Sequence, residues 1–151
     1  KEVEYVRSYL TIQKMRYKDK LEFEIEVEPC IAHVPIIRLV LQPIVENAIY
    51  HGLKYKDSKG LLKVHGYMKG ENVVIDIIDD GVGMDEETLK HIYDKHKVNY
   101  RSNGVGVYNV QQRLVLYYGK DYGIIYDSEK GKGTTASVVI PGIQEESHEK
   151  S

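Results

Sequence analysis

The sequence predicts an α+β fold, a two-layer sandwich in which a mixed, mostly antiparallel sheet carries helices on one face. The first observation is the order of the elements: helix, strand, helix, two strands, helix, loop, helix and two strands. The second is that both strand pairs are joined by short turns, at 69–71 and 129–133. Such turns favour antiparallel hairpins, and the helices must then bury one face of the resulting sheet.

The composition indicates a single globular domain. The chain has 151 residues, of which 42% are hydrophobic and 29% charged, and its formal net charge is −2. This charge gives no indication of nucleic-acid binding, and no apolar run approaches the roughly 20 residues that a membrane span requires. The single cysteine, Cys30, excludes an internal disulfide.

The chain begins without methionine, inside a pattern that already predicts a helix, and we therefore expect it to be a piece of a longer protein. Its apolar positions are Val3, Val6, Leu10 and Met15. Residues 21–28 alternate strictly between apolar residues and glutamate, which predicts a half-buried strand. The next helix should run from Pro35 to about Tyr55, with Pro43 removing a hydrogen bond or causing a kink.

The later elements follow from the same periodicities. A helix face is expected to bury Val107, Val110, Leu114 and Tyr117. The predicted strands are 61–68, 72–79, 123–127 and 134–140, and the predicted helices are 85–96 and 105–118, with a polar loop at 96–104. The polar tail at 143–151 should be frayed.

The first segment that could bind a ligand lies on the helix predicted from Pro35 to about Tyr55. Asn47, His51 and Lys54, together with Tyr50, share one edge of it at helical spacing. An asparagine carbonyl oxygen is a ligand suited to Mg²⁺, whereas the simpler interpretation is a solvated helix face.

The second segment is 79–84. Asp79 continues the apolar row Val73, Ile75 and Ile77, so its carboxylate should point into the core, where it needs a partner. The exocyclic amine of an adenine would be a suitable one, and Gly81 and Gly83 would let a ligand approach the backbone. A turn closed by an Asx-type hydrogen bond explains the segment equally well.

The third segment is a glycine-rich turn at 104–109 that leads into a helix, and free amides at a helix N-terminus favour phosphate. The nearby cations that could neutralise a triphosphate are Lys95, Lys97, Arg101 and Arg113. The turn is neither a dinucleotide fingerprint nor a Walker loop, because Asn109 replaces the third glycine and no Gly-Lys-Ser/Thr follows.

In this order, the three segments resemble the asparagine box and the glycine boxes of histidine kinases and their relatives, which include gyrase, Hsp90 and MutL. The runs that carry the resemblance are Glu46-Asn47-Ala48-Ile49-Tyr50-His51-Gly52, Asp79-Asp80-Gly81-Val82-Gly83 and Gly104-Val105-Gly106-Val107. The runs 42–52, 9–17 and 109–114 are closer still to sensor kinases of the YesM/LytS type, and the similarity covers about residues 3–141.

The resemblance implies a Bergerat-type ATP-binding fold over residues 18–142, with residues 1–17 as the end of a dimerisation and phosphoacceptor helix. It implies that Asn47 holds Mg²⁺ on the ATP phosphates and that Asp79 binds the adenine amine. The full set of residues that it assigns to ATP is Asn47, His51, Lys54, Asp79, Gly81, Gly83, Met84, Gly104, Val105, Gly106, Val107 and Thr134.

Three positions depart from the pattern of these kinases. Asp80 replaces a frequent asparagine, and Tyr50 replaces a frequent lysine, for which Lys54 could substitute. Pro43 stands where hydrolysing relatives carry a glutamate base. Because proline cannot accept a proton, this favours phosphoryl transfer to a protein over steady hydrolysis.

The resemblance also implies partners outside this sequence. None of the six histidines has the Pro-His-Phe setting of the acceptor, which should therefore lie upstream. The parent protein would be a homodimeric bacterial membrane sensor with this domain in the cytoplasm and a response regulator downstream. The fragment should be monomeric, bind no nucleic acid and not phosphorylate itself.

Two other classes of function stay open from the sequence. A standalone anti-sigma-factor serine kinase would share the run 47–52 but would carry glutamate at position 43. A degenerate regulatory module would not bind ATP.

Overall fold

The computed structural model describes residues 2–17, 21–31, 41–49, 60–83 and 104–142. Its helices are α1 (Glu2–Tyr17), α2 (Leu41–Asn47) and α4 (Gly104–Tyr118), and a single 3₁₀ turn spans Pro29–Ile31. Its strands are β1 (Leu21–Val27), β2 (Gly60–Lys69), β3 (Asn72–Asp79), β4 (Gly123–Glu129) and β5 (Gly133–Pro141). The predicted helix 85–96 and the loop 96–104 lie largely outside the described residues.

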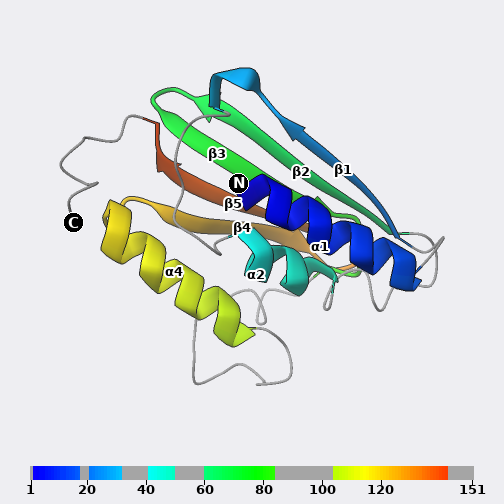
Figure 1. The fold of residues 1–151 in the computed structure, drawn as a ribbon. Coiled ribbons are helices and arrows are strands. Elements are labelled where there is room, and N and C mark those ends of the chain that lie inside the picture. The colour runs from blue at the N-terminus through cyan, green and yellow to red at the C-terminus, as the bar shows by residue number, and fades with distance from the viewer. Residues whose placement is uncertain (1, 18–20, 32–40, 50–59, 84–103, 143–151) are drawn as a thin grey trace.

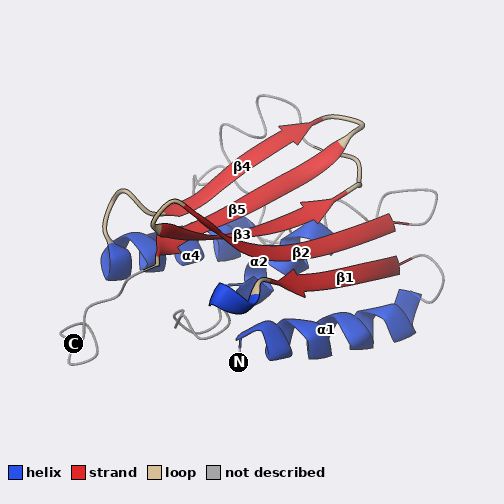
Figure 2. Cartoon of the chain, turned by 90° about the horizontal axis from the view of Figure 1, so that it is seen from above, coloured by secondary structure: helices blue, strands red, loops and turns tan. Residues whose placement is uncertain are grey.

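The five strands form one sheet in the order β1-β2-β3-β5-β4. β1 pairs with β2 in parallel, and the other three pairs are antiparallel. The helices lie on one side of the sheet (Figure 1), and the other side is open in Figure 2, where α1 runs alongside the edge strand β1. The predicted α+β sandwich with a mixed, mostly antiparallel sheet is confirmed.

The core fills the space between the sheet and the helices. Alternate positions of the strands point into it, as their period of two requires. The largest side chains that it buries completely are Val6, Leu10, Leu21, Leu41, Ile44, Val45, Leu62, Val64, Ile77, Leu114 and Ile140. Of the apolar positions predicted on the first and last helices, Val6, Leu10, Val110 and Leu114 are buried in this core.

The predicted burial of two helix residues, Met15 and Tyr117, is wrong. Met15 is 73% exposed because it lies five residues after the buried Leu10, about 140° away around the helix. Tyr117 is 42% exposed because it stands in the last turn of α4, where its ring contacts Tyr118 at a centroid distance of 4.7 Å. α4 ends at Tyr118, as predicted, and is followed by Gly119, whose φ is +112°.

The open face of the sheet carries a hydrogen-bonded group of side chains at its centre. Both carboxylate oxygens of Asp76 accept hydrogen bonds, from the Tyr67 hydroxyl at 2.9 Å and from the Ser137 hydroxyl at 2.6 Å. Burial raises the pKa of Tyr67 above its ordinary 10.0, and the hydrogen bond to Asp76 and the negative charge of Asp76 add to this effect.

The raised pKa makes the contribution of Tyr67 to stability depend on pH. A group with a raised folded-state pKa stabilises fully below its unfolded pKa and loses that contribution as the pH rises through the folded value. We expect Tyr67→Phe to lower the free energy of unfolding by about 1 kcal/mol at pH 7, and the difference from wild type to shrink above pH 10. Urea denaturation at both pH values measures it, with the exposed Tyr117→Phe as a control.

Candidate functional site

One end of the helix-facing side of the sheet is polar, although the rest of that side is built from apolar side chains. Asp79 of β3 pairs with Thr134 of β5, which in turn pairs with Ser128 of β4. We call these three residues the polar row. The next row inward is Ile77, Ala136 and Tyr126. Polar side chains gathered at the margin of a core indicate a binding site for a ligand with matching hydrogen-bonding groups.

Asp79 is the buried member of the polar row, with 4% of its surface exposed. Its Oδ1 accepts a hydrogen bond from the Gly81 amide at 2.9 Å. The structure therefore combines the two interpretations of this segment, because the carboxylate is buried in the core and also closes an Asx turn. A carboxylate has about four lone-pair positions, of which the Gly81 amide uses one.

The turn between β4 and β5 packs directly on the segment that follows Asp79. The Gly131 amide donates to the Val82 carbonyl at 2.6 Å. A Cβ at Gly133, whose φ is +111°, would overlap the Asp79 carbonyl oxygen, and a Cβ at Gly83, with φ +73°, would overlap that of Glu129. These two glycines are therefore required for the close approach of two backbone segments, which fixes the position of Asp79.

Asp80 points away from the polar row and binds the start of β2. Its Oδ1 accepts from the Leu61 amide at 2.8 Å, and its own amide donates to the Leu61 carbonyl at 3.3 Å. An asparagine oxygen would accept the same hydrogen bond. The replacement of a frequent asparagine by Asp80 therefore affects how the segment after β3 is anchored to β2.

This geometry predicts that Asp80→Asn leaves the free energy of unfolding nearly unchanged. Asp80→Ala removes the acceptor for the Leu61 amide and should cost about 1 kcal/mol. Urea denaturation of the two variants side by side measures the difference. Equal loss in both variants would mean that the charge of Asp80, rather than its acceptor oxygen, matters.

Ser128 is the member of the polar row that sequence reasoning missed. Its Oγ lies 2.7 Å from Thr134 Oγ1 and donates to the Gly133 carbonyl at 3.0 Å. The sequence signal that could have identified Ser128 is the alternation of Ile124, Tyr126 and Ser128, which places all three on the same side of β4.

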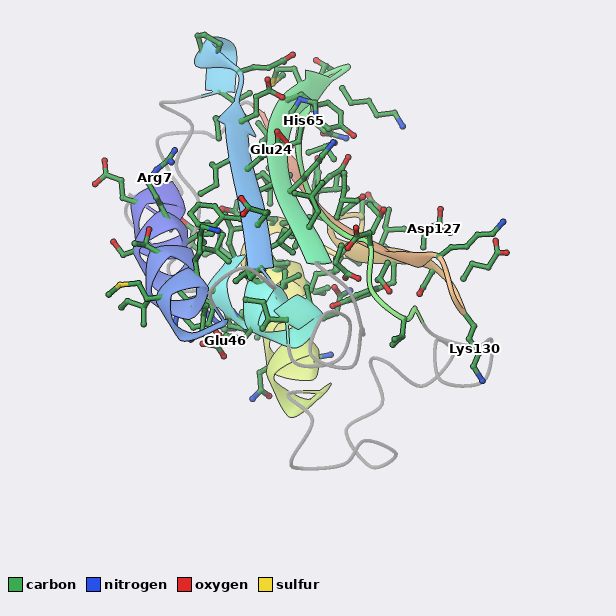
Figure 3. The ribbon with its side chains drawn as sticks, turned by 90° about the vertical axis from the view of Figure 1, so that its right-hand side faces the viewer. Arg7, Glu24, Glu46, His65, Asp127 and Lys130 are labelled. Atoms are coloured by element: carbon green, nitrogen blue, oxygen red, sulfur yellow. The ribbon has the colours of Figure 1, made fainter. Side chains whose placement is uncertain are left out.

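Two helices carry further residues that the sequence assigns to the site. Asn47 is the last residue of α2, and Gly104–Val107 form the first turn of α4, which packs against α2. The end of α2, the end of β3 and the β4–β5 turn lie toward the same end of the sheet (Figure 1). In Figure 3, Glu46 marks the end of α2, and Lys130 marks the tip of the β4–β5 turn. His51, Lys54 and Met84 lie outside the described residues.

Comparisons with known proteins show the family of this chain. Residues 33–144 match the family described as histidine kinase-, DNA gyrase B-, and HSP90-like ATPase. The sensor protein LytS of Oceanobacillus iheyensis is 33% identical over 143 residues, which are 93% of this chain and 24% of that protein. The sensor histidine kinase YesM of Bacillus subtilis is 31% identical over 140 residues, which cover 93% and 23%. The chain thus spans about a quarter of these relatives.

Solved structures share the fold at low sequence identity. The catalytic domain of the histidine kinase ThkA superposes with a TM-score of 0.69 at 14% identity, covering 93% of this chain and 95% of that one. The blue-light activated histidine kinase of Erythrobacter litoralis gives 0.68 at 18% identity, covering 95% and 42%. In the described part of this chain, every helix falls short of the length and apolar character needed to cross a bilayer. The chain belongs to the family of histidine kinase-, DNA gyrase B- and HSP90-like ATPases, and its fold is that of a histidine kinase catalytic domain.

Proposed function

We propose that this chain is the ATP-binding catalytic domain of a sensor histidine kinase, and that its polar row holds the adenine. The observation that carries the proposal is the buried Asp79, which lies beside Thr134 at the margin of the core. A buried carboxylate is a hydrogen-bond acceptor that matches the exocyclic amine of adenine. Gly81 and Gly83 would form the wall next to the base, with Met84 following them.

The phosphates would lie toward the two helix ends. The first turn of α4, Gly104–Val107, offers backbone amides that have no partner within the helix, together with the positive end of its dipole. Asn47 ends α2 at the same end of the sheet and would be the side chain that contacts Mg²⁺ on the phosphates. The magnesium ion would neutralise the charge on the transferred phosphoryl group, and His51 and Lys54 would complete this side of the site.

The residues of α2 favour transfer of the phosphoryl group to a protein over hydrolysis of ATP. Pro43 lies within α2, one turn before Asn47, and a proline can neither take a proton from water nor orient it. The acceptor would be a histidine on helices upstream of residue 1, of which α1 would be the last part. The parent would then be a dimeric bacterial membrane sensor that holds this domain on its cytoplasmic side and passes the phosphoryl group to a response regulator.

Calorimetric titration of the chain with ATP tests the binding part of the proposal. We expect saturable binding of one ATP, weaker when EDTA removes Mg²⁺, because Asn47 would hold the metal and the metal would offset the charge of the phosphates. Failure of the folded chain to bind ATP at millimolar concentration would contradict the proposal and would favour a regulatory module.

Transfer of the phosphoryl group is tested by incubating the longer parent protein with labelled ATP. A phosphohistidine is lost in acid and survives in base, and this is the expected result. An acid-stable product would indicate a serine kinase instead, and release of phosphate without any labelled protein would indicate an ATPase.

A further inference from the structure

We propose that Gln111 is a positioning residue that holds α4 at one place on the sheet, and with it the helix turn that would bind the ATP phosphates. The inference rests on the proposed ATP site and concerns only the phosphate side of that site. It starts from a hydrogen bond between the middle of α4 and the edge strand β4, which the Ile124 amide donates to Gln111 Oε1 at 2.8 Å.

The direction of this hydrogen bond follows from its donor. A backbone amide can only donate, so the Gln111 atom that faces it must be the carbonyl oxygen of the side chain. β4 stands at the end of the strand order, next to β5. Amides along such a strand alternate between the neighbouring strand and the outside of the sheet. The Ile124 amide points to the outside, where it meets α4.

The start of β4 is shaped to receive the Gln111 side chain. A Cβ added to Gly123 would lie 2.6 Å from Gln111 Oε1 and 2.9 Å from its Cδ, closer than packed atoms approach. Gly123 also has a φ of +143°, a conformation that favours glycine. Glycine at this position therefore lets the carboxamide of Gln111 lie against the backbone and reach the next amide.

The apolar contacts on either side of Gln111 are less directional. Val110 and Leu114 are buried, with 2% and 0% of their surfaces exposed. Apolar burial is proportional to area and has no preferred direction, so it opposes removal of the helix more than a slide or a rotation. A hydrogen bond weakens steeply when its length or angle changes. The bond to Ile124 therefore sets both the axial position and the rotation of α4.

The position of α4 decides where its first turn lies. Gly104–Val107 precede Gln111 by four to seven residues of the same helix, which is about 6–10 Å. A slide of the helix moves these backbone amides by the same amount. The attraction between a helix N-terminus and an anion falls off within one turn, so a small slide weakens phosphate binding. The polar row lies on the strands, with Ser128 at the other end of β4, so adenine binding should not change.

The test compares adenosine with ATP at a fixed Mg²⁺ concentration, because the two ligands share base and ribose and differ in the phosphates. NMR titration of the ¹⁵N-labelled chain gives both Kd values, and the ratio of the adenosine Kd to the ATP Kd measures the contribution of the phosphates. We expect Gln111→Met, which keeps the length and lacks the acceptor oxygen, to reduce this ratio by roughly 3- to 10-fold. Gln111→Asn, which is too short to reach the Ile124 amide, should act in the same way.

Gln112 provides the control, because it is the same residue type one position later and is exposed. Gln112→Met should leave the ratio unchanged. Gln111→Glu keeps an oxygen that accepts from the Ile124 amide but adds a negative charge, and Gln112→Glu adds such a charge alone. We expect the two glutamate variants to give the same ratio.

The outcomes separate this inference from the proposed function. If Gln111→Met and Gln111→Asn leave the ratio unchanged, or weaken adenosine and ATP equally, Gln111 is only structural and the inference is wrong. A wild type that binds adenosine as tightly as ATP also overturns it, while the adenine site stands. If folded wild type binds neither ligand, the proposed function itself fails and the inference falls with it.

Discussion

Asp79→Asn is expected to weaken ATP binding by roughly 10- to 100-fold while leaving the domain folded. The asparagine oxygen can still accept the hydrogen bond that the Gly81 amide donates to Oδ1 at 2.9 Å, so the Asx turn survives. The second oxygen becomes an amino group, which would place a donor against the amine of adenine. A hydrogen bond to a charged group contributes about 1.5–3 kcal/mol, which corresponds to this loss of affinity. Calorimetric titration with ATP measures it.

Asp76→Asn is the matched control for this experiment. It removes the same charge from the same strand, but Asp76 lies on the open face, bonded to Tyr67 and Ser137. Because Asp76 lies on the face of the sheet opposite to Asp79, we expect the ATP affinity of this variant to stay within about 2-fold of wild type. Equal weakening by both substitutions would show that net charge rather than the polar row controls binding.

Gly133→Ala should be the most destabilising single substitution among those considered for the hairpin. The φ of +111° is a conformation that alanine rarely adopts, and its Cβ would overlap the Asp79 carbonyl oxygen. Backbone strain and overpacking together should cost about 2–5 kcal/mol of the free energy of unfolding. Since the clash pushes the β4–β5 turn away from Asp79, ATP binding should weaken in the fraction that stays folded. Urea denaturation measures the first effect.

Gly70→Ala separates backbone strain from the clash. Gly70 lies in the β2–β3 hairpin with a φ of +63°, and no atom lies within 4 Å of its added Cβ. This variant should lose only about 1–2 kcal/mol, the cost of a left-handed alanine. A loss as large as that of Gly133→Ala would mean that the contact between the turn and Asp79 contributes little.

The sequence was sufficient for the elements whose side chains follow a strict period. The alternation in 72–79 correctly predicted that Asp79 points into the core, where it is 4% exposed. The short turns at 69–71 and 129–133 predicted the two hairpins, which the structure contains as β2–β3 and β5–β4. These features depend on neighbours along the chain, so local patterns suffice for them.

Features that depend on the pairing of distant segments could not be predicted. Ser128 precedes a turn, a common place for serine, and only the register of β4 against β5 sets it beside Thr134. The anchoring of Asp80 to Leu61 joins residues 19 positions apart. Met15, by contrast, was misassigned although its spacing of five residues from Leu10 already places it about 140° from the buried side of the helix. The ATP-binding roles of all the residues assigned from the sequence stay predictions.

The location of ATP on the polar row is tested most directly by recording amide resonances of the ¹⁵N-labelled chain during a titration with Mg-ATP. The account predicts that the largest shifts occur at Gly81, Gly83, Gly133 and Thr134, while the amides of Gly70, Tyr67 and Asp76 stay nearly unchanged. Glycine amides resonate in a separate region, so the comparison of Gly83 and Gly133 with Gly70 is clear. Shifts confined to the open face, or none at saturating ATP in the folded protein, would contradict it.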